Sequence, residues 1–280
     1  VIINATVYNI GASDASSVTV QFYLGDPDAS GSQIGSIQNV NIDAGDSSTV
    51  SVTWDATIGT SQIYIVVDYA DSIAENSEAN NKVSKQIDVS SWHFFYGEIS
   101  SDSKFTLTDS ADYEIGEWNM TDYSGANIYV TDYDSSVNWL TLQAIGRDAS
   151  DAASSGDIAE IDSILGSTSF ADSITALYMD GASINDTETF TVFSDTIANV
   201  PVAVSINSSN FKTGILWDTS DDSDGEYDST EKEDIIFVTK VNQDTSGSYE
   251  NTDYEMRVPA LLRTYDSTNS QTAVFYVEIN

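Results

Sequence analysis

The residues best suited to chemistry form an acidic run from Asp218 to Asp234, DTSDDSDGEYDSTEKED. Calcium binds carboxylate and carbonyl oxygens, and a twelve-residue calcium loop supplies them at fixed positions around a central glycine. Gly225 occupies that glycine position. The residues at the ligand positions are Ser220, Asp222, Asp224, Glu226 (through its carbonyl), Asp228 and Glu231. The run predicts a structural calcium loop in a β context, although Ser220 stands where Asp is usual; an acidic loop that binds nothing is the alternative.

A second acidic stretch runs from Tyr64 to Lys82, YIVVDYADSIAENSEANNK. An alternating apolar strand leads into it, and a second strand follows from Val83. Its oxygen-bearing side chains could hold a hard cation. The residues concerned are Asp68, Asp71, Glu75 and Asn81. We favour a simpler interpretation, in which Asp and Asn side chains bond the backbone of their own turns.

Catalytic residues are hard to find. The chain has one histidine, His93, and no cysteine, so disulfides, thiolate metal sites and cysteine nucleophiles are excluded. His93 lies among aromatic residues, without the acidic partner that a serine nucleophile's base requires. No glycine-rich phosphate loop is present, and none of the 45 acidic residues is singled out as a catalytic pair. We expect a protein that is not an enzyme and carries no cofactor, apart from a structural Ca²⁺ ion.

Four Asn-x-Ser/Thr sequences are possible glycosylation sites. They begin at Asn4, Asn119, Asn185 and Asn207. A composition this rich in Asn, Ser and Thr gives as many by chance, so only position separates them. Asn4 falls on the polar face of the first strand, where a glycan could extend into solvent.

Charge and composition limit the partners. A formal net charge of −36 and nine Lys and Arg residues leave no basic patch for nucleic acid. No apolar run is long enough to span a bilayer, and no signal peptide is present. With 40% apolar residues the chain can build packed cores. We expect a processed, secreted protein at the cell surface, with cell-surface glycans as possible partners.

Short strands follow one another closely through the first ninety residues. Val1, Ile3, Ala5 and Val7 alternate with polar positions, and further strand-like runs recur up to Val89. Breaks fall at turn sequences such as GDPD and AGD. Strands at this spacing, without helical periodicity, predict a β-sandwich.

The same residues resemble the CARDB family, the cell-adhesion-related domains of bacterial and archaeal surface proteins. The resemblance rests on the segments VTVQFYLGD, IDAGDSSTVSVTW and VVDYADSIAENSEANN. The matching positions are Ala44, Gly45, Val50, Trp54, Asp68, Ile73, Glu75, Glu78, Asn80 and Asn81. Ser77 departs from the usual Asn. The resemblance implies an Ig-like sandwich over about the first third of the chain and leaves function open.

The sequence predicts a mostly β fold in two domains: an N-terminal Ig-like β-sandwich at residues 1–91, and a larger β-rich domain at 92–280. Trp92 opens the second domain, which resembles those that follow CARDB modules in archaeal surface proteins. A short helical insertion is expected near 157–165, with Asp157 as a capping residue and Gly166 at its end. Further strands are expected from Phe105 onwards.

Both ends of the chain read as strands with an apolar stripe. A terminal strand that leaves its own sheet can complete the edge of a neighbour's. The inter-subunit candidates are Val1, Ile3, Val7, Phe275, Val277 and Ile279. The alternative is that each strand closes its own domain. Together these features predict a non-catalytic extracellular subunit of an archaeal surface filament, pilus-like and self-associating; the alternatives are a surface-layer protein and an adhesion or polysaccharide-binding module.

Overall fold

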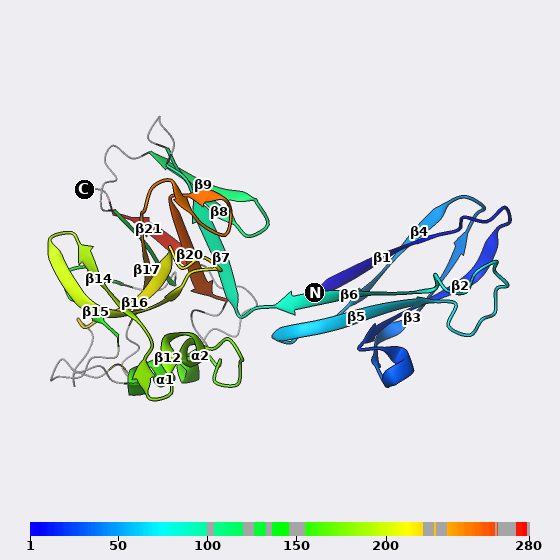
Figure 1. The fold of residues 1–280 in the computed structure, drawn as a ribbon, viewed down its shortest axis with the longest axis horizontal. Coiled ribbons are helices and arrows are strands. Elements are labelled where there is room, and N and C mark those ends of the chain that lie inside the picture. Colours follow the sequence, from blue (N-terminus) through cyan, green and yellow to red (C-terminus); the bar gives the residue numbers. More distant parts are fainter. Residues whose placement is uncertain are drawn as a thin grey trace. The chain divides into compact units, whose positions relative to one another are not determined.

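The computed structural model describes residues 1–99, 104–119, 126–132, 136–145, 155–220, 227, 234–260, 262 and 273–278. Within them the fold is mostly β, with antiparallel sheets and short helices, as predicted. The chain divides into two compact units, Val1–Ser90 and Ser91–Asn280, and each is described by itself (Figure 1). The sequence places this boundary one residue later, before Trp92.

Unit 1 is built from two antiparallel sheets. Its strands are β1 (Ile2–Tyr8), β2 (Ala15–Leu24), β3 (Ser32–Ile42), β4 (Ser47–Thr53), β5 (Gly59–Val67) and β6 (Lys82–Val89), with a 3-10 turn at Pro27–Ala29. The smaller sheet pairs β1 with β4, and the larger has the order β3-β2-β5-β6. Buried residues from both sheets meet in one core: Ala5, Val20, Phe22, Ile34, Val50, Val52, Trp54 and Ile63. This is the sandwich that the alternating pattern predicts, because each strand buries one face.

Unit 2 also contains two main sheets. Its helices are α1 (Ser155–Ile164) and α2 (Ile174–Tyr178). Its strands are β7 (Trp92–Gly97), β8 (Lys104–Asp109), β9 (Glu114–Asn119), β10 (Asn127–Asp132), β11 (Leu142–Ala144), β12 (Met179–Asp180), β13 (Ser183–Ile184), β14 (Thr187–Val192), β15 (Asp195–Val204), β16 (Lys212–Asp218), β17 (Ile235–Lys240), β18 (Thr245–Ser246), β19 (Asn251–Thr252), β20 (Tyr254–Pro259) and β21 (Ala273–Val277). The larger sheet runs β14-β15-β16-β17-β10-β21, with β11 also on β16, and the smaller runs β20-β7-β8-β9.

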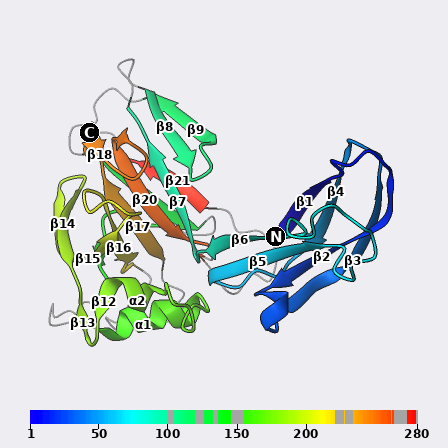
Figure 2. The ribbon, with the colours of Figure 1, turned by 45° about the vertical axis from the view of Figure 1, so that its right-hand side comes forward.

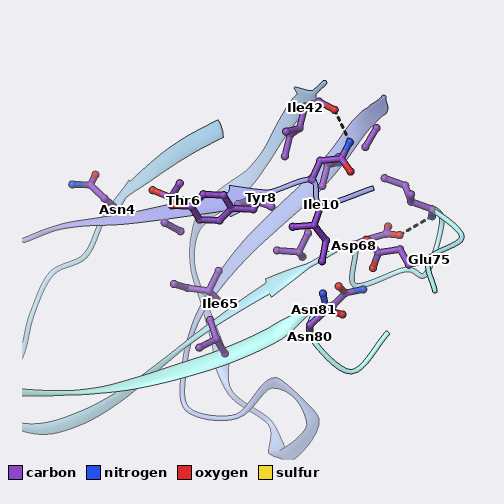
Figure 3. A pocket seen from close by; sticks show the side chains of 18 residues that line it. Asn4, Thr6, Tyr8, Ile10, Ile42, Ile65, Asp68, Glu75, Asn80 and Asn81 are labelled. Atoms are coloured by element: carbon purple, nitrogen blue, oxygen red, sulfur yellow. Dashed lines mark hydrogen bonds between the residues drawn. The ribbon is translucent and has the colours of Figure 1, made fainter. Parts of the chain in front are cut away.

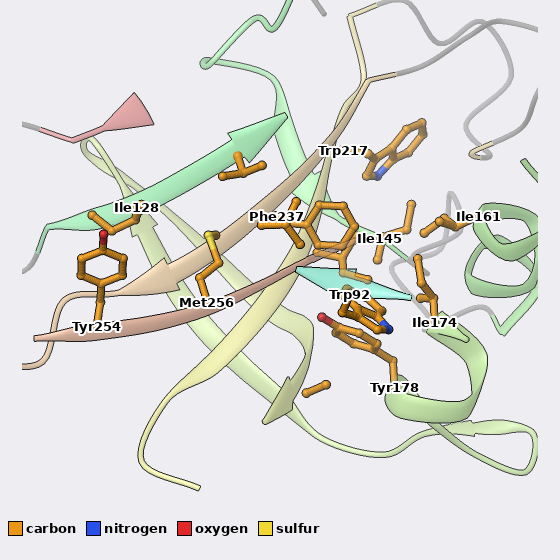
Figure 4. Packing of buried hydrophobic residues seen from close by; sticks show 14 of the residues in the cluster. Trp92, Ile128, Ile145, Ile161, Ile174, Tyr178, Trp217, Phe237, Tyr254 and Met256 are labelled. Carbon is orange, nitrogen blue, oxygen red and sulfur yellow. The ribbon is translucent and has the colours of Figure 1, made fainter. Parts of the chain in front are cut away.

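The larger sheet of unit 2 is buried on both faces. One face meets the smaller sheet in a core that includes Trp92, Phe237 and Met256 (Figure 4). The other face carries a second cluster, to which Leu216 and Ile236 belong. Successive residues of β16 and β17 therefore enter opposite cores, so these strands are apolar at nearly every position.

The predicted helix is present as α1, and a second helix lies beside it. Ile158, Ile161 and Leu165 are buried, and Gly166 follows the helix with φ +67°. Since α1 begins by Ser155, Asp157 lies inside its first turn and is not the capping residue. Helix α2, capped by Ser173, has only five residues and was not predicted. Both helices lie at one end of the large sheet (Figure 2).

Candidate functional site

The acidic loop between β5 and β6 is held by its own side chains. The Asp68 carboxylate, 6% exposed, accepts a hydrogen bond of 2.6 Å from the Ile73 backbone N–H. Glu78 accepts bonds from the Glu75 backbone N–H at 3.2 Å and from the Asn81 side-chain amide at 2.9 Å. Asp68 also adopts φ +46°, a conformation that Asp and Asn tolerate better than most residues. These contacts match the favoured interpretation of a self-bonded turn.

Lys82 ties the end of this loop to the turn after β2. Its ammonium lies 2.6 Å from an Asp28 carboxylate oxygen and 2.9 Å from one of Asp26. The hydrogen bonds to Asp28 and then Asp26 raise the pKa of Lys82 above its ordinary value. The hydrogen bond from Lys82 likewise lowers the pKa of Asp26. All three side chains are solvent-accessible, so the pairs orient the loop more than they stabilise it.

The structure describes all residues of the weaker calcium candidate in unit 1, but only one of the candidate at 220–231. In the described parts of the chain, no three His, Cys, Asp or Glu side chains converge closely enough to hold a metal ion. Asp71 and Glu75 are exposed, while Asp68 is turned to Ile73. Of the preferred set only Ser220 is described; Asp222, Asp224, Glu226, Asp228 and Glu231 lie outside the described residues. Calcium binding by either set stays a prediction.

Asp218 and Asp234, the two ends of the acidic run 218–234, are buried carboxylates that the sequence did not single out. Asp218, fully buried, accepts hydrogen bonds from the Asn138 backbone N–H at 2.6 Å and the Thr141 hydroxyl at 2.7 Å. It also accepts bonds from the Ser220 backbone N–H at 2.9 Å and the Ser220 hydroxyl at 3.0 Å. Asp234, 4% exposed, accepts one of 2.7 Å from the backbone N–H of Ser136. The pair fixes the segment 136–141 beside the ends of β16 and β17. Only the fold reveals this, since in sequence both residues look like part of the acidic run.

The remaining predicted positions are mostly at the surface. The side chains of Asn4, Asn119, Asn185 and Asn207 are all exposed, so solvent reaches each potential glycan acceptor. His93 is exposed on β7, with its ring centroid 6.3 Å from that of Phe95. None of these placements tests glycosylation or catalysis.

Both terminal strands pair within their own chain. Strand β1, which contains Ile3 and Val7, lies against β4, and Val1 just before it bonds the Trp54 carbonyl. Strand β21, with Phe275 and Val277, lies against β10, at one end of the large sheet. Ile279 lies outside the described residues. Donation of either strand to another subunit therefore stays a prediction that requires exchange.

A groove of about 460 Å³ runs along β1 on the side away from β4. The residues from Asn4 to Ile10 form one wall, and Ile65, Val67 and Val83 contribute to the other. Asp68, Glu75, Asn80 and Asn81, all from the acidic loop, also line it. Figure 3 shows Asn4, Thr6 and Tyr8 along β1, with Asp68 and Glu75 near Ile10. The acidic loop therefore closes one end of an otherwise largely uncharged groove.

Comparison with known proteins agrees with this geometry for unit 1. Residues 1–85 match the CARDB family model, so the chain carries a CARDB domain there, followed by a further β-rich region. CARDB domains are typical of cell-surface proteins. A search of the curated proteins finds no match.

Two solution structures resemble part of the chain. The CARDB domain of a Pyrococcus furiosus protein is 20% identical, with a TM-score of 0.28, over 32% of this chain and 78% of that one. A Geobacter metallireducens protein is 33% identical, with a TM-score of 0.28, over 31% of this chain and 79% of that one.

Proposed function

We propose that the chain is a non-catalytic extracellular structural protein whose first unit is a cell-surface adhesion-related module. The observation that carries the proposal is the match of residues 1–85 to the CARDB family. The acidic loop supports it, because the carboxylates of Asp68 and Glu78 accept hydrogen bonds from backbone N–H groups of the same loop. These side chains therefore have a structural role. Among the described residues, no helix is long and apolar enough to cross a membrane.

In its fuller form the proposal is that copies of the chain self-associate into an archaeal, pilus-like surface filament, as a glycoprotein with bound calcium. The net charge of −36 opposes close packing of copies in dilute buffer. Calcium or high salt would screen that repulsion. Assembly through strand exchange would use β1 or β21, whose apolar stripes suit pairing with another sheet.

Electron microscopy and analytical ultracentrifugation of the purified protein, in NaCl and in CaCl₂ at matched ionic strength, test assembly. We expect filaments or concentration-dependent polymers, at least in CaCl₂. A two-dimensional lattice would favour the surface-layer alternative. A monodisperse monomer at high protein concentration in both salts, together with saturable binding on a glycan array, would favour a polysaccharide-binding module.

A further inference from the structure

The two sheets of unit 1 differ in width, and the difference leaves room for one more strand. The β1–β4 sheet has two strands, whereas the facing sheet has four. The groove beside β1 is lined by Ile65 and Val67 of β5 and by Val83 of β6, so it lies over the part of the wider sheet that β1 does not cover. We propose that this groove accepts one extended β-strand from a separate polypeptide. The strand would be apolar at alternate positions, uncharged along its middle, and basic at the end beside Asp68 and Glu75.

Strand β1 has backbone N–H and C=O groups that could pair with an added strand. Val1 and Trp54 exchange two hydrogen bonds, of 2.8 and 2.9 Å, so the odd-numbered residues of β1 are those bonded to β4. The N–H and C=O groups of Ile2, Asn4, Thr6 and Tyr8 consequently point to the groove side. Among the described strands, β4 is the one neighbour of β1. Seven residues from Asn4 to Ile10 line the groove, a length of about 20 Å in a strand.

The groove also suits the side chains of an added strand. Residues directly opposite each other on adjacent strands project to the same face of a sheet. Alternate side chains of the added strand would therefore point inward, on the same face as Ala5 and Val7. There they would meet Ile65 and Val83, and Val83 is 60% exposed. Apolar side chains at alternate positions would therefore bury surface that water now contacts.

Charge indicates which strand fits. Residues 1–13 and β4 contain no charged side chain, although the chain carries 45 acidic and nine basic residues. Protein sheet edges commonly carry charges that prevent pairing, and this edge has none. At the Ile10 end, Asp68 and Glu75 line the groove. A Lys or Arg on the incoming strand would meet the exposed Glu75 there, next to the largely buried Asp68, and an acidic residue would be repelled.

The geometry disfavours a second copy of this chain as the source. If a second copy paired its own β1 with this β1, the two four-stranded sheets would lie in the same layer. The β5 and β6 strands of one copy would then clash with those of the other. Strand β21 is followed directly by Glu278, whose carboxylate is bonded to Asn127 and Tyr129 and holds the strand in its own unit. The proposal goes beyond the proposed function and stands whether or not copies of the chain polymerise.

A synthetic peptide tests the groove directly in the full chain. The probe is a fluorescein-labelled nonapeptide in which Val alternates with Ser or Thr. It is made in two versions, one with a single Lys at the N-terminal end and one with a single Lys at the C-terminal end. We expect saturable binding by fluorescence anisotropy, with one Lys placement preferred. Amide hydrogen exchange should slow by about tenfold or more at Ile2, Asn4, Thr6 and Tyr8 when the peptide binds, while β1 amides bonded to β4 are protected beforehand.

Matched variants separate the groove from the rest of the surface. Val83→Glu places a charge in the groove and should weaken binding at least tenfold, whereas Ser84→Glu, on the opposite face of β6, should leave it within twofold. Glu75→Gln should abolish the preference for one Lys placement, and Asp71→Asn, outside the groove, should retain it. Circular dichroism confirms that each variant is folded.

Three outcomes would overturn the proposal. The first is no binding at millimolar peptide. The second is binding without slower exchange at the four β1 amides. The third is equal or tighter binding of a peptide with the sequence of residues 271–280, abolished by Val83→Glu, which would make a second copy of the chain the occupant. Failure of the chain to form filaments would leave the peptide result unaffected, so the two proposals fail separately.

Discussion

The phenolic hydroxyl of Tyr129 donates a hydrogen bond of 2.7 Å to the buried carboxylate of Glu278, 149 residues further along the chain. The same carboxylate accepts bonds from the Asn127 side-chain amide at 2.9 Å and the Phe193 backbone N–H at 2.7 Å. Burial, followed by the bond to Glu278, raises the pKa of Tyr129 well above its usual value. This cluster fastens the end of β21 to the large sheet.

Tyr129→Phe should lower the free energy of unfolding of unit 2 by about 1–3 kcal/mol, because a buried charged acceptor loses one donor. Urea denaturation followed by tryptophan fluorescence measures the loss. Tyr276→Phe is the matched control, since that side chain on β21 is 38% exposed and should change stability little. Equal effects of the two variants would show that the Tyr129–Glu278 bond does not hold β21.

Asp218→Asn should destabilise unit 2 by about 2–4 kcal/mol, since it removes a buried charge that accepts four hydrogen bonds. An amide presents N–H groups to some of the same donors. Ser220→Ala removes only one of the four bonds and should cost about 1 kcal/mol. Hydrogen exchange at Asn138 should rise markedly in Asp218→Asn and little in Ser220→Ala; the reverse order would contradict this assignment.

Glu255→Gln should stabilise the protein above neutral pH. Glu255 is fully buried, and burial raises the pKa of its carboxyl despite hydrogen bonds from the Ser248 and Tyr249 backbone N–H groups. A raised folded-state pKa favours the protonated form, so stability is greatest below the unfolded pKa and falls as pH rises through the folded value. Thermal melts from pH 4 to 8 should show this decline in the parent and a smaller one in Glu255→Gln.

Glu250→Gln, an exposed acid nearby, serves as the control and should follow the parent's decline with pH. Glu98 has a pKa raised by burial and by the neighbouring charges of Asp253 and Asp244, so part of the decline should persist in both variants. An identical pH dependence for the parent and Glu255→Gln would refute a charged Glu255 as a source of instability.

Substitutions of Asp68 should separate hydrogen bonding from backbone conformation. Asp68→Ala loses the bond to Ile73 and places a residue with a Cβ but no polar group at φ +46°, which should cost unit 1 about 2–4 kcal/mol. Asp68→Gly removes the strain and should cost less, and Asp68→Asn least, because it keeps an acceptor. Denaturation monitored at Trp54 tests the order Asn, Gly, Ala; Ala as the mildest change would exclude the turn-capping role.

Calcium should raise the melting temperature of unit 2 more than NaCl at equal ionic strength, because only a site-bound ion adds to general screening. Asp222→Asn combined with Asp224→Asn should remove the excess. The matched pair Asp71→Asn and Glu75→Gln should leave it unchanged. Loss of the effect only in the second pair would assign calcium to the loop of unit 1.

Local patterns predict the first unit well because each of its strands buries one face. Ala5 is buried and Asn4 is exposed, as their alternation on β1 indicates. The turn at Asp68 was also expected from local sequence, because Asp side chains commonly accept hydrogen bonds from the backbone of their own turn. The groove beside β1 could not be predicted, because it depends on the relative width of two sheets assembled from distant segments.

The second unit was predicted less completely for a physical reason. Its fixed carboxylates are bonded across long stretches of chain: Asp218 to Asn138, and Glu278 to Asn127. No local spacing records such pairs. Helix α2 has too few residues to show a period, and strands of two or three residues, such as β11, give no alternating signal.

The burial of β16 and β17 on both faces has a consequence for how the sequence can vary over evolution. Leu216 and Ile236 enter one core while Trp217 and Phe237 enter the other. A polar side chain at any of these positions could not reach solvent. The outward positions of β1 and β4 have that freedom. Among relatives of this chain, unit 2 should therefore retain an apolar central signature while the surface strands of unit 1 diverge, and deep mutational scanning should reproduce the same contrast.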